Sequence, residues 1–196
     1  MTRSVILFVG VIAAVLMSYT GLSLLPGLQL FDIEATPGTT DYTFEEARGR
    51  EGYIRDGCIY CHSQQIRPEN FGSDIARGWA PRPPKAGDYL YDDPHLLGTS
   101  RTGPDLSDIA SRQPSWDWHM AHFYNPRAVS PGSIMPAYPY YFDVIAPGAV
   151  LASQRIVPLP AEYAPPDGRV VVAKEDVENL YAYLMALRVE PLDAAE

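Results

Sequence analysis

The sequence predicts a mainly α-helical protein in which a single N-terminal transmembrane helix precedes a helical, loop-rich globule. Three observations lead to this fold class. A long stretch near the N-terminus carries no charged side chain. The C-terminal part repeats apolar residues at intervals of three and four, the spacing of an amphipathic helix. Nineteen prolines among 196 residues keep the remaining elements short, because proline interrupts both helices and central strands.

The uncharged stretch runs from Ser4 to Leu25, which is 25 − 4 + 1 = 22 residues. As a helix it would extend about 33 Å, enough to cross a hydrocarbon core of about 30 Å. A cleaved secretory signal is the alternative, but its apolar part is usually shorter and ends in an A-x-A-like site. We find no such site between Tyr19 and Leu28. We therefore expect a membrane anchor over residues 1–30 and a linker over residues 31–41.

Charge is distributed unevenly around the anchor. Arg3 precedes the uncharged stretch, whereas all 24 acidic and 14 of the 15 basic residues follow it, a balance of 14 − 24 = −10. By the positive-inside rule, the N-terminus is expected in the cytoplasm and the globule on the opposite side of the membrane. An acidic globule also argues against a nucleic-acid partner, which requires a basic face.

The globule is expected over residues 42–190, followed by a C-terminal tail over residues 191–196. Its first helix should begin at Thr43, because Glu46 stands at capping-box spacing, and should run toward Gly57. The last helix should lie within Lys174 to Arg188. Another helix is expected from Gln113 to Tyr124. Arg169 to Ala173 is the single credible strand.

The chemistry is carried by Cys58, Cys61 and His62, which form a C-x-x-C-H sequence. Two thiols at this spacing reach the two vinyl groups of a porphyrin, and the following imidazole is placed to ligate its iron. A thioredoxin-like redox pair would need a βαβ setting, and a zinc site would need further ligands, yet the chain has two cysteines in all. We therefore predict one covalently bound haem c, with His62 as an iron ligand.

The iron needs a sixth ligand, and Met135 is the expected one. Prolines on both sides, Pro131 and Pro136, stiffen its loop enough to hold a weak thioether on the iron. The other candidates are placed on helices or lack a supporting pattern: Met120, Met185, His95, His119 and His122. A His/Met pair raises the reduction potential and leaves no open coordination position, so electron transfer is expected rather than bond-making catalysis.

The order of short sequences along the chain resembles class I cytochrome c. The matching positions are Gly49 and Tyr53, the haem sequence, Thr102 to Leu106, Asn125-Pro126, Met135-Pro136, and Leu180 with Tyr183. The resemblance implies that the Pro104 carbonyl accepts a hydrogen bond from the proximal histidine, which orients the ring. It also implies that the first and last helices of the globule cross through Gly49, Tyr53, Leu180 and Tyr183.

Four longer sequences are similar to the mono-haem cytochrome c subunit (subunit II, CcoO/FixO-like) of cbb3-type cytochrome c oxidases. They are Tyr53 to Pro68, Arg101 to Leu106, Trp118 to Arg127, and Met135 to Pro139. The resemblance implies a non-catalytic electron-transfer subunit. It would receive electrons from a di-haem cytochrome c subunit or another donor cytochrome c and pass them to the polytopic haem-copper catalytic subunit. It also implies a single-pass protein of the bacterial inner membrane with a periplasmic haem domain.

Some alternatives stay open at this point. The cytochrome c subunit of a membrane nitric oxide reductase shares the anchor and the haem, and a free-standing membrane-anchored electron shuttle is a third reading. Arg67, Arg101 and Arg112 are candidates for contacts with haem propionates, and we retain Arg112 as a cofactor-binding candidate. His119 and His122 share a helix face but lack further metal ligands nearby in the sequence.

Overall fold

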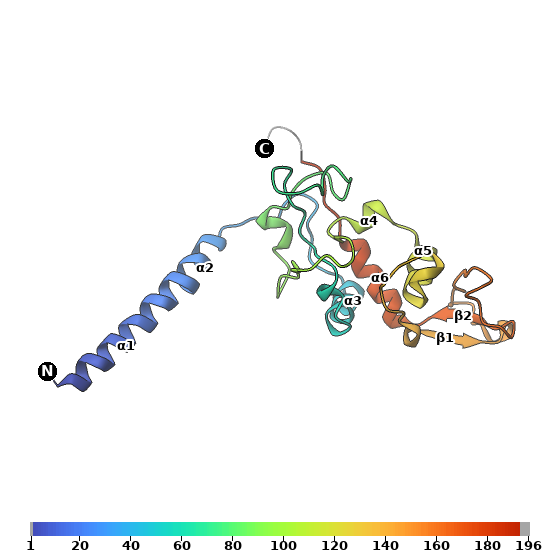
Figure 1. The fold of residues 1–196 in the computed structure, drawn as a ribbon, viewed down its shortest axis with the longest axis horizontal. Helices are drawn as coiled ribbons and strands as arrows, with labels where there is room; N and C mark the ends of the chain where they lie inside the picture. The colour runs from blue at the N-terminus through green and yellow to red at the C-terminus, as the bar shows by residue number, and fades with distance from the viewer. Residues whose placement is uncertain (1, 193–196) are drawn as a thin grey trace. The chain divides into compact units, whose positions relative to one another are not determined.

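The computed structural model describes residues 2–192, so the last four residues of the predicted tail lie outside the described part of the chain. It divides into two compact units. One unit contains the chain up to Thr39 together with Lys85–Leu90, and the other contains Thr40–Pro84 and the chain from Tyr91 onward. Figure 1 shows the order of the elements.

The first unit is dominated by the N-terminal helix. It consists of α1 (Arg3–Tyr19), a π-helical turn η1 (Thr20–Leu24) and α2 (Leu25–Leu30), with Pro26 near the start of α2, directly after the π-helical turn. Together they make a continuous helix of 28 residues, whose most apolar 18-residue window has a mean hydropathy of 2.3 and no buried residues. The helix is therefore long and apolar enough to span a membrane, as predicted.

The segment Lys85–Leu90 packs with this unit through close backbone contacts. It contains a short 3-10 turn, η3 (Ala86–Tyr89), in which the Gly87 carbonyl accepts a hydrogen bond from Thr36 N at 3.3 Å. A Cβ at Gly87 would come within 2.3 Å of the Glu34 carbonyl oxygen. Glycine is thus the residue that permits this approach, which the sequence analysis did not anticipate.

The second unit is built around two helices, α3 (Phe44–Arg55) and α6 (Glu175–Ala186). Thr43 and Glu46 form the predicted capping box at the start of α3. The two helices cross where Gly49 lies against α6, since a Cβ at Gly49 would come within 1.9 Å of the Asn179 carbonyl oxygen. The rings of Tyr53 and Tyr183 meet edge to face at 5.5 Å, so the predicted helix crossing is confirmed.

Two further helices cover this pair, α4 (Ile109–Arg112) and α5 (Trp116–Tyr124). The predicted helix over 113–124 begins three residues late. Gln113 is extended, with φ −145° and ψ 74°, because the ring of Pro114 disfavours a helical conformation at the preceding residue. Ser115 then caps α5 by accepting a hydrogen bond from Trp118 N.

A two-stranded antiparallel sheet completes the second unit (Figure 1). β1 (Phe142–Ile145) pairs with β2 (Val170–Ala173), with Phe142 opposite Ala173. The second strand was predicted, whereas β1 was not, because four residues after a run of Pro and Tyr carry little strand signal. Four 3-10 turns lie in the connections: η2 (Cys58–Tyr60), η4 (Pro126–Ala128), η5 (Pro139–Tyr141) and η6 (Pro147–Ala149).

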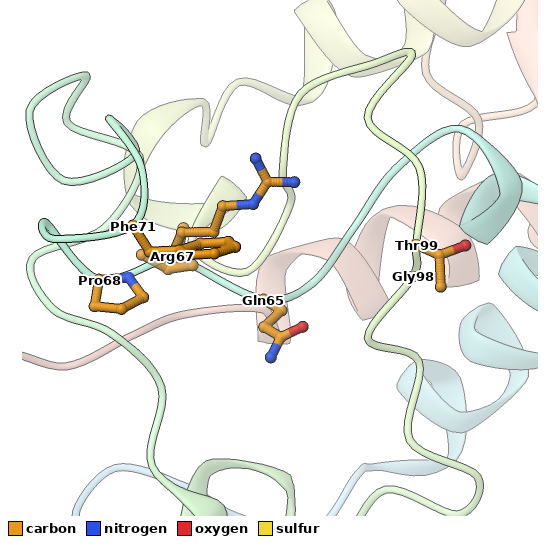
Figure 2. A pocket seen from close by; sticks show the side chains of 7 residues that line it. Gln65, Arg67, Pro68, Phe71, Gly98 and Thr99 are labelled. Carbon is orange, nitrogen blue, oxygen red and sulfur yellow. The ribbon is translucent and has the colours of Figure 1, made fainter.

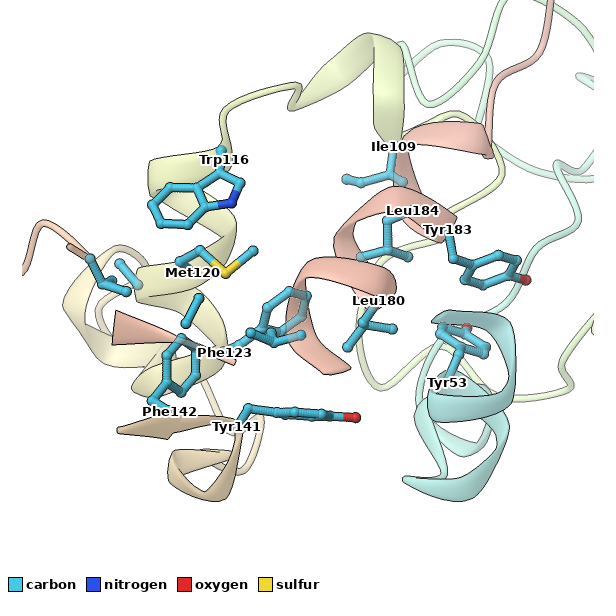
Figure 3. Close-up of a cluster of buried hydrophobic side chains, with 14 of the residues drawn as sticks. Tyr53, Ile109, Trp116, Met120, Phe123, Tyr141, Phe142, Leu180, Tyr183 and Leu184 are labelled. Carbon is cyan, nitrogen blue, oxygen red and sulfur yellow. The ribbon is translucent and has the colours of Figure 1, made fainter. Parts of the chain in front are cut away.

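The hydrophobic core lies between α3, α5, α6 and the sheet. Figure 3 shows the side chains that meet there, including Tyr53, Trp116, Met120, Phe123, Phe142, Leu180, Tyr183 and Leu184. Cys58 and Met135 are both partly buried against this same cluster. The core therefore supports both the cysteine pair and the methionine loop, which lie far apart in the sequence.

Candidate haem site

The two cysteines lie on a tight turn that follows α3. Gly57 has φ 74°, a left-handed conformation that favours glycine, and it turns the chain into η2. His62 N donates to the Cys58 carbonyl at 2.9 Å and closes the turn. Both thiols are free, Cys58 partly buried and Cys61 exposed. Burial raises the pKa of the Cys58 thiol to about 12, so it remains a neutral thiol.

The His62 imidazole is oriented by a hydrogen bond that it donates to a backbone carbonyl of a distant loop. Its Nδ1 lies 2.7 Å from the Pro104 carbonyl oxygen. Because a carbonyl oxygen accepts only, Nδ1 carries the proton, and Nε2 is left with its lone pair available to a metal. Burial lowers the pKa of His62, while the Pro104 carbonyl and the Asp105 charge act in the opposite direction. The ring is thus held neutral and in one tautomer.

The ring also lies against a glycine that no other residue can replace without a clash. A Cβ at Gly103 would come within 2.3 Å of Cε1 and 2.8 Å of Nε2 of His62. Gly103 N donates to the Cys61 carbonyl at 2.9 Å, which fixes this approach. At Gly98, where φ is 71°, a Cβ would come within 2.6 Å of the His62 carbonyl oxygen. Two glycines therefore make the space that His62 occupies.

A buried ionic network lies beside His62, and the sequence analysis did not predict it. Asp105 is fully buried and accepts from Ser63 Oγ at 2.6 Å, Gln65 N at 2.8 Å and Ser107 N at 2.8 Å. Arg101 reaches Asp105 at 3.4 Å and Asp74 at 2.6 Å. The sequence does contain a signal for this network. Arg101 and Asp105, a cation and a carboxylate four residues apart, flank the Gly103-Pro104 pair.

Asp74 is the closer partner of Arg101 in this network. Burial acts to raise the pKa of Asp74, but the Arg67 backbone N–H and the Arg101 guanidinium outweigh it, so the pKa lies below its usual value. Arg101 also donates to Ser63 Oγ at 2.7 Å and to the Gln65 carbonyl. Its guanidinium is therefore engaged within the protein and does not serve as a free propionate contact.

Met135 lies in a loop that is tied back to α5 and to the turn η4 that follows it. Tyr138 N donates to the Phe123 carbonyl at 2.9 Å. Arg127 Nη2 donates to the Met135 carbonyl at 3.0 Å. Met120, by contrast, is completely buried in the core, and Met185 packs against the core from α6. Of these methionines, Met135 is the one on a partly buried loop.

The two histidines of α5 differ in their surroundings. His119 Nε2 lies 2.8 Å from the Gln113 carbonyl, and burial lowers its pKa to about 4. His122 stacks on Trp118 with ring centroids 4.4 Å apart. Its Nδ1 is buried and has no partner within residues 2–192. Burial, followed by the charges of His119 and His62, lowers the pKa of His122 to about 4. His122 therefore interacts electrostatically with His62.

Arg112 and Arg67 have opposite environments. Arg112 is partly buried on α4, donates through Nη2 to the Asp105 carbonyl, and has a buried Nε without a partner among the described residues. Arg67 is exposed and lies 5.9 Å from the centre of the Phe71 ring. Across residues 2–192, no three His, Cys, Asp or Glu side chains gather as a metal site.

An open pocket of about 370 Å³ lies beside the loop that follows His62 in the sequence (Figure 2). Gln65, Ile66, Arg67, Pro68 and Phe71 line one side of it, and Gly98 and Thr99 line the other. The pocket contains none of the residues predicted to bind the haem sulfurs or iron. It adjoins the candidate haem site, because Gly98 also lies against the His62 backbone.

The residues present fit a covalent haem in their donor chemistry. Two reduced thiols precede an imidazole whose Nδ1 is already bonded, and the glycine at position 103 keeps side-chain atoms away from the ring. Together with the helical fold and the apolar N-terminal helix, this donor set defines the class of membrane-anchored c-type cytochromes.

The comparison with known families agrees with this class and makes it more specific. Residues 1–157 match the family described as Cytochrome C oxidase, mono-heme subunit/FixO, and the chain belongs to this family. It is therefore a cytochrome c oxidase subunit of a mono-haem family, which implies one haem. No curated protein matches the chain. The family match ends before β2 and α6.

Proposed function

We propose that this chain carries one covalent haem c and relays single electrons from a donor cytochrome c to the haem-copper catalytic subunit of a cbb3-type oxidase. Membership of the oxidase subunit family supports the electron-transfer role. The donor is proposed to be the di-haem cytochrome c subunit of the same complex. The acceptor is proposed to be the haem b of the polytopic subunit that reduces oxygen.

The residues divide the work of holding the haem. Cys58 and Cys61 supply the two sulfurs for thioether bonds, and their turn is closed by the His62 N–H. His62 offers Nε2 to the iron because the Pro104 carbonyl holds Nδ1. Met135 offers its thioether from a loop tied to α5, and Arg112 offers its partly buried guanidinium to a propionate.

A haem bound in this way would carry one electron at a time, at a raised reduction potential. His62 and Met135 would both bind the iron through side chains of this chain, which would leave no position on the iron for a substrate. His62 stays neutral, and no proton transfer by these residues is needed. The chemistry of oxygen reduction thus belongs to the partner subunit.

We further propose the arrangement in the membrane. Residues 1–30 form the anchor, residues 31–41 the linker and residues 42–190 the haem domain. The single basic residue ahead of the anchor and the acidic balance after it support a cytoplasmic N-terminus and a periplasmic haem domain. The bacterial inner membrane is then the location.

One observation carries the proposal: the His62 ring is bonded through Nδ1 to Pro104 and packed on Gly103 directly after two free thiols. A spectrum of the full-length protein denatured in alkaline pyridine tests it. We expect the bands of one c-type haem per chain. Bands of a non-covalent haem, or no haem, would contradict the proposal.

The partners need a separate experiment. The tagged chain, purified in mild detergent, should bring with it a large polytopic haem-copper subunit and a di-haem cytochrome. The complex should consume oxygen when given a reduced donor. A complex that reduced nitric oxide and not oxygen, or a chain that purified alone, would contradict the proposed partners.

A further inference from the structure

Asp105 has an unusual position next to the proposed iron ligand. It directly follows Pro104, whose carbonyl accepts the His62 Nδ1 hydrogen bond. Its carboxylate is completely buried and is held by three short hydrogen bonds, from Ser63 Oγ, Gln65 N and Ser107 N. Its charge acts on His62. Because the carboxylate is buried and fixed in place, water screens its electrostatic effect on neighbouring groups only weakly.

The charges around Asp105 are unevenly spaced. Asp74, Asp105 and Asp108 are buried carboxylates, and the charges of Arg67, Arg101 and Arg112 act on them, a balance of 3 − 3 = 0. Arg101 lies 2.6 Å from Asp74 and 3.4 Å from Asp105, so it neutralises Asp74 more completely. The three close donors to Asp105 are neutral groups. Asp105 is therefore a buried carboxylate whose closest partners carry no charge, with Arg101 farther from it than from Asp74.

Negative charge at this place acts on the oxidised and reduced states of the haem differently. The oxidised haem carries one more positive charge than the reduced haem, so a nearby carboxylate favours oxidation. The same charge strengthens the His62 to Pro104 hydrogen bond and makes the ring a stronger donor to the iron, which again favours the oxidised state. Both effects lower the reduction potential.

We infer that Asp105 is a positioning residue that lowers the reduction potential of the haem through His62, and that Arg101 sets the size of the effect by binding Asp74 in preference to Asp105. The inference rests on the proposed function. In each turnover the haem accepts one electron from the donor and gives the same electron to the acceptor, and no bond in this chain forms or breaks. Asp105 adjusts how readily that electron is accepted.

Asp105→Asn tests this inference, because asparagine keeps the size of the side chain and removes its charge. In the full-length protein at a fixed ambient potential, we expect the ratio of reduced to oxidised haem to rise by about threefold to tenfold. A tenfold change corresponds to 59 mV for one electron. An unchanged or lower ratio would overturn the inference.

The sign of the change separates this role from a structural one. A variant that merely loosened the loop would admit water to the haem, and water favours the oxidised state. The ratio would then fall. Asp108→Asn is the matched control, since Asp108 is also buried and bonded, to Ser111 Oγ and Val189 N, but is not among the groups that act on the pKa of His62. In Asp108→Asn, the ratio of reduced to oxidised haem should change less than twofold.

Asp74→Asn provides a second variant if Asp105→Asn does not fold. With Asp74 uncharged, Arg101 is released to neutralise Asp105, so the ratio should again rise, but less. A fall would contradict the inference. The spectrum in alkaline pyridine is recorded for each protein: absence of covalent haem from the parent protein would disprove the proposed function, whereas normal haem with an unchanged ratio would disprove the role of Asp105 alone.

Discussion

The two sides of the proposed haem are held in different ways. On the His62 side, the ring is fixed by Pro104, packed on Gly103 and surrounded by the buried network of Arg101 and Asp105. On the Met135 side, the loop is held through backbone atoms, with Arg127 Nη2 on the Met135 carbonyl and Ser133 Oγ on Met135 N at 3.3 Å. The neighbouring Ile134 is 74% exposed.

This difference indicates that the two sides depend on different kinds of contact. On the His62 side, several contacts fix the position of the ring, so removing any one of them leaves others in place. Side chains of a buried network supply these contacts. The Met135 side depends on loop stiffness, which Pro131 and Pro136 supply. We therefore expect changes on the two sides to differ: they should affect haem attachment, stability and a smaller adjustment of the potential on the His62 side, and ligand exchange with a larger change of potential on the Met135 side.

The largest effect is expected from replacing both cysteines with serine. Cys58→Ser with Cys61→Ser removes both sulfurs while leaving His62 in place. We expect complete loss of covalent haem, measured by the spectrum in alkaline pyridine after acid-acetone extraction. Haem that stayed attached to this double variant would contradict the assignment.

Gly103→Ala should have the next largest effect. Its Cβ would lie 2.3 Å from His62 Cε1, so the ring must move and lose its bond to Pro104. Overpacking of this kind typically costs about 1 to 3 kcal/mol. We expect less haem per chain and a lower melting temperature by circular dichroism.

Gly148→Ala serves as the control for Gly103→Ala, because nothing lies within 4 Å of its Cβ position. It should behave like the parent protein. Equal melting temperatures for the two variants would show that the approach of His62 to Gly103 does not matter for stability.

Met135→Ala should leave haem attachment intact and change its properties. We expect the weak near-infrared thioether-to-iron band to disappear and the ratio of reduced to oxidised haem at a fixed potential to fall by about tenfold or more, because a thioether ligand raises the potential. Met120→Leu, a change in the buried core, should keep the band. A band retained in Met135→Ala would identify another methionine as the ligand.

A smaller effect concerns pH. Burial lowers the pKa of His119 to about 4, below the value of about 6.5 in an unfolded chain. Between these values the unfolded chain binds more protons, so the free energy of unfolding falls as the pH drops from about 6.5 to about 4. The full shift corresponds to roughly 3 kcal/mol. Thermal melts from pH 7 to pH 4.5 measure it.

His119→Gln should reduce this pH dependence and leave the part that His122 contributes, because glutamine can still donate to the Gln113 carbonyl and does not titrate. His95→Gln, at an exposed position, should leave the parent profile unchanged. Parallel profiles for His119→Gln and the parent protein would show that His119 does not contribute.

The elements with a strong local signal were predictable from the sequence. The N-terminal helix, the capped helix α3 and the amphipathic helix α6 follow from uninterrupted patterns, and the structure has all three. The contact between His62 and Pro104 was implied by resemblance alone, since no local rule joins residues 42 positions apart. The network of Asp105 and the packing of Lys85–Leu90 were missed because both depend on tertiary contacts between loops without periodicity.

The crossing of α3 and α6 has a consequence for the order of assembly. Gln64 and Tyr183 share a hydrogen bond across 119 positions, and α6 lies near the end of the described chain. During synthesis, the cysteine turn emerges long before the helix that closes the core over it. Contacts between such distant residues require the closure of a long loop. The thiols therefore remain accessible while the chain is incomplete, which is the interval available for attaching the proposed haem.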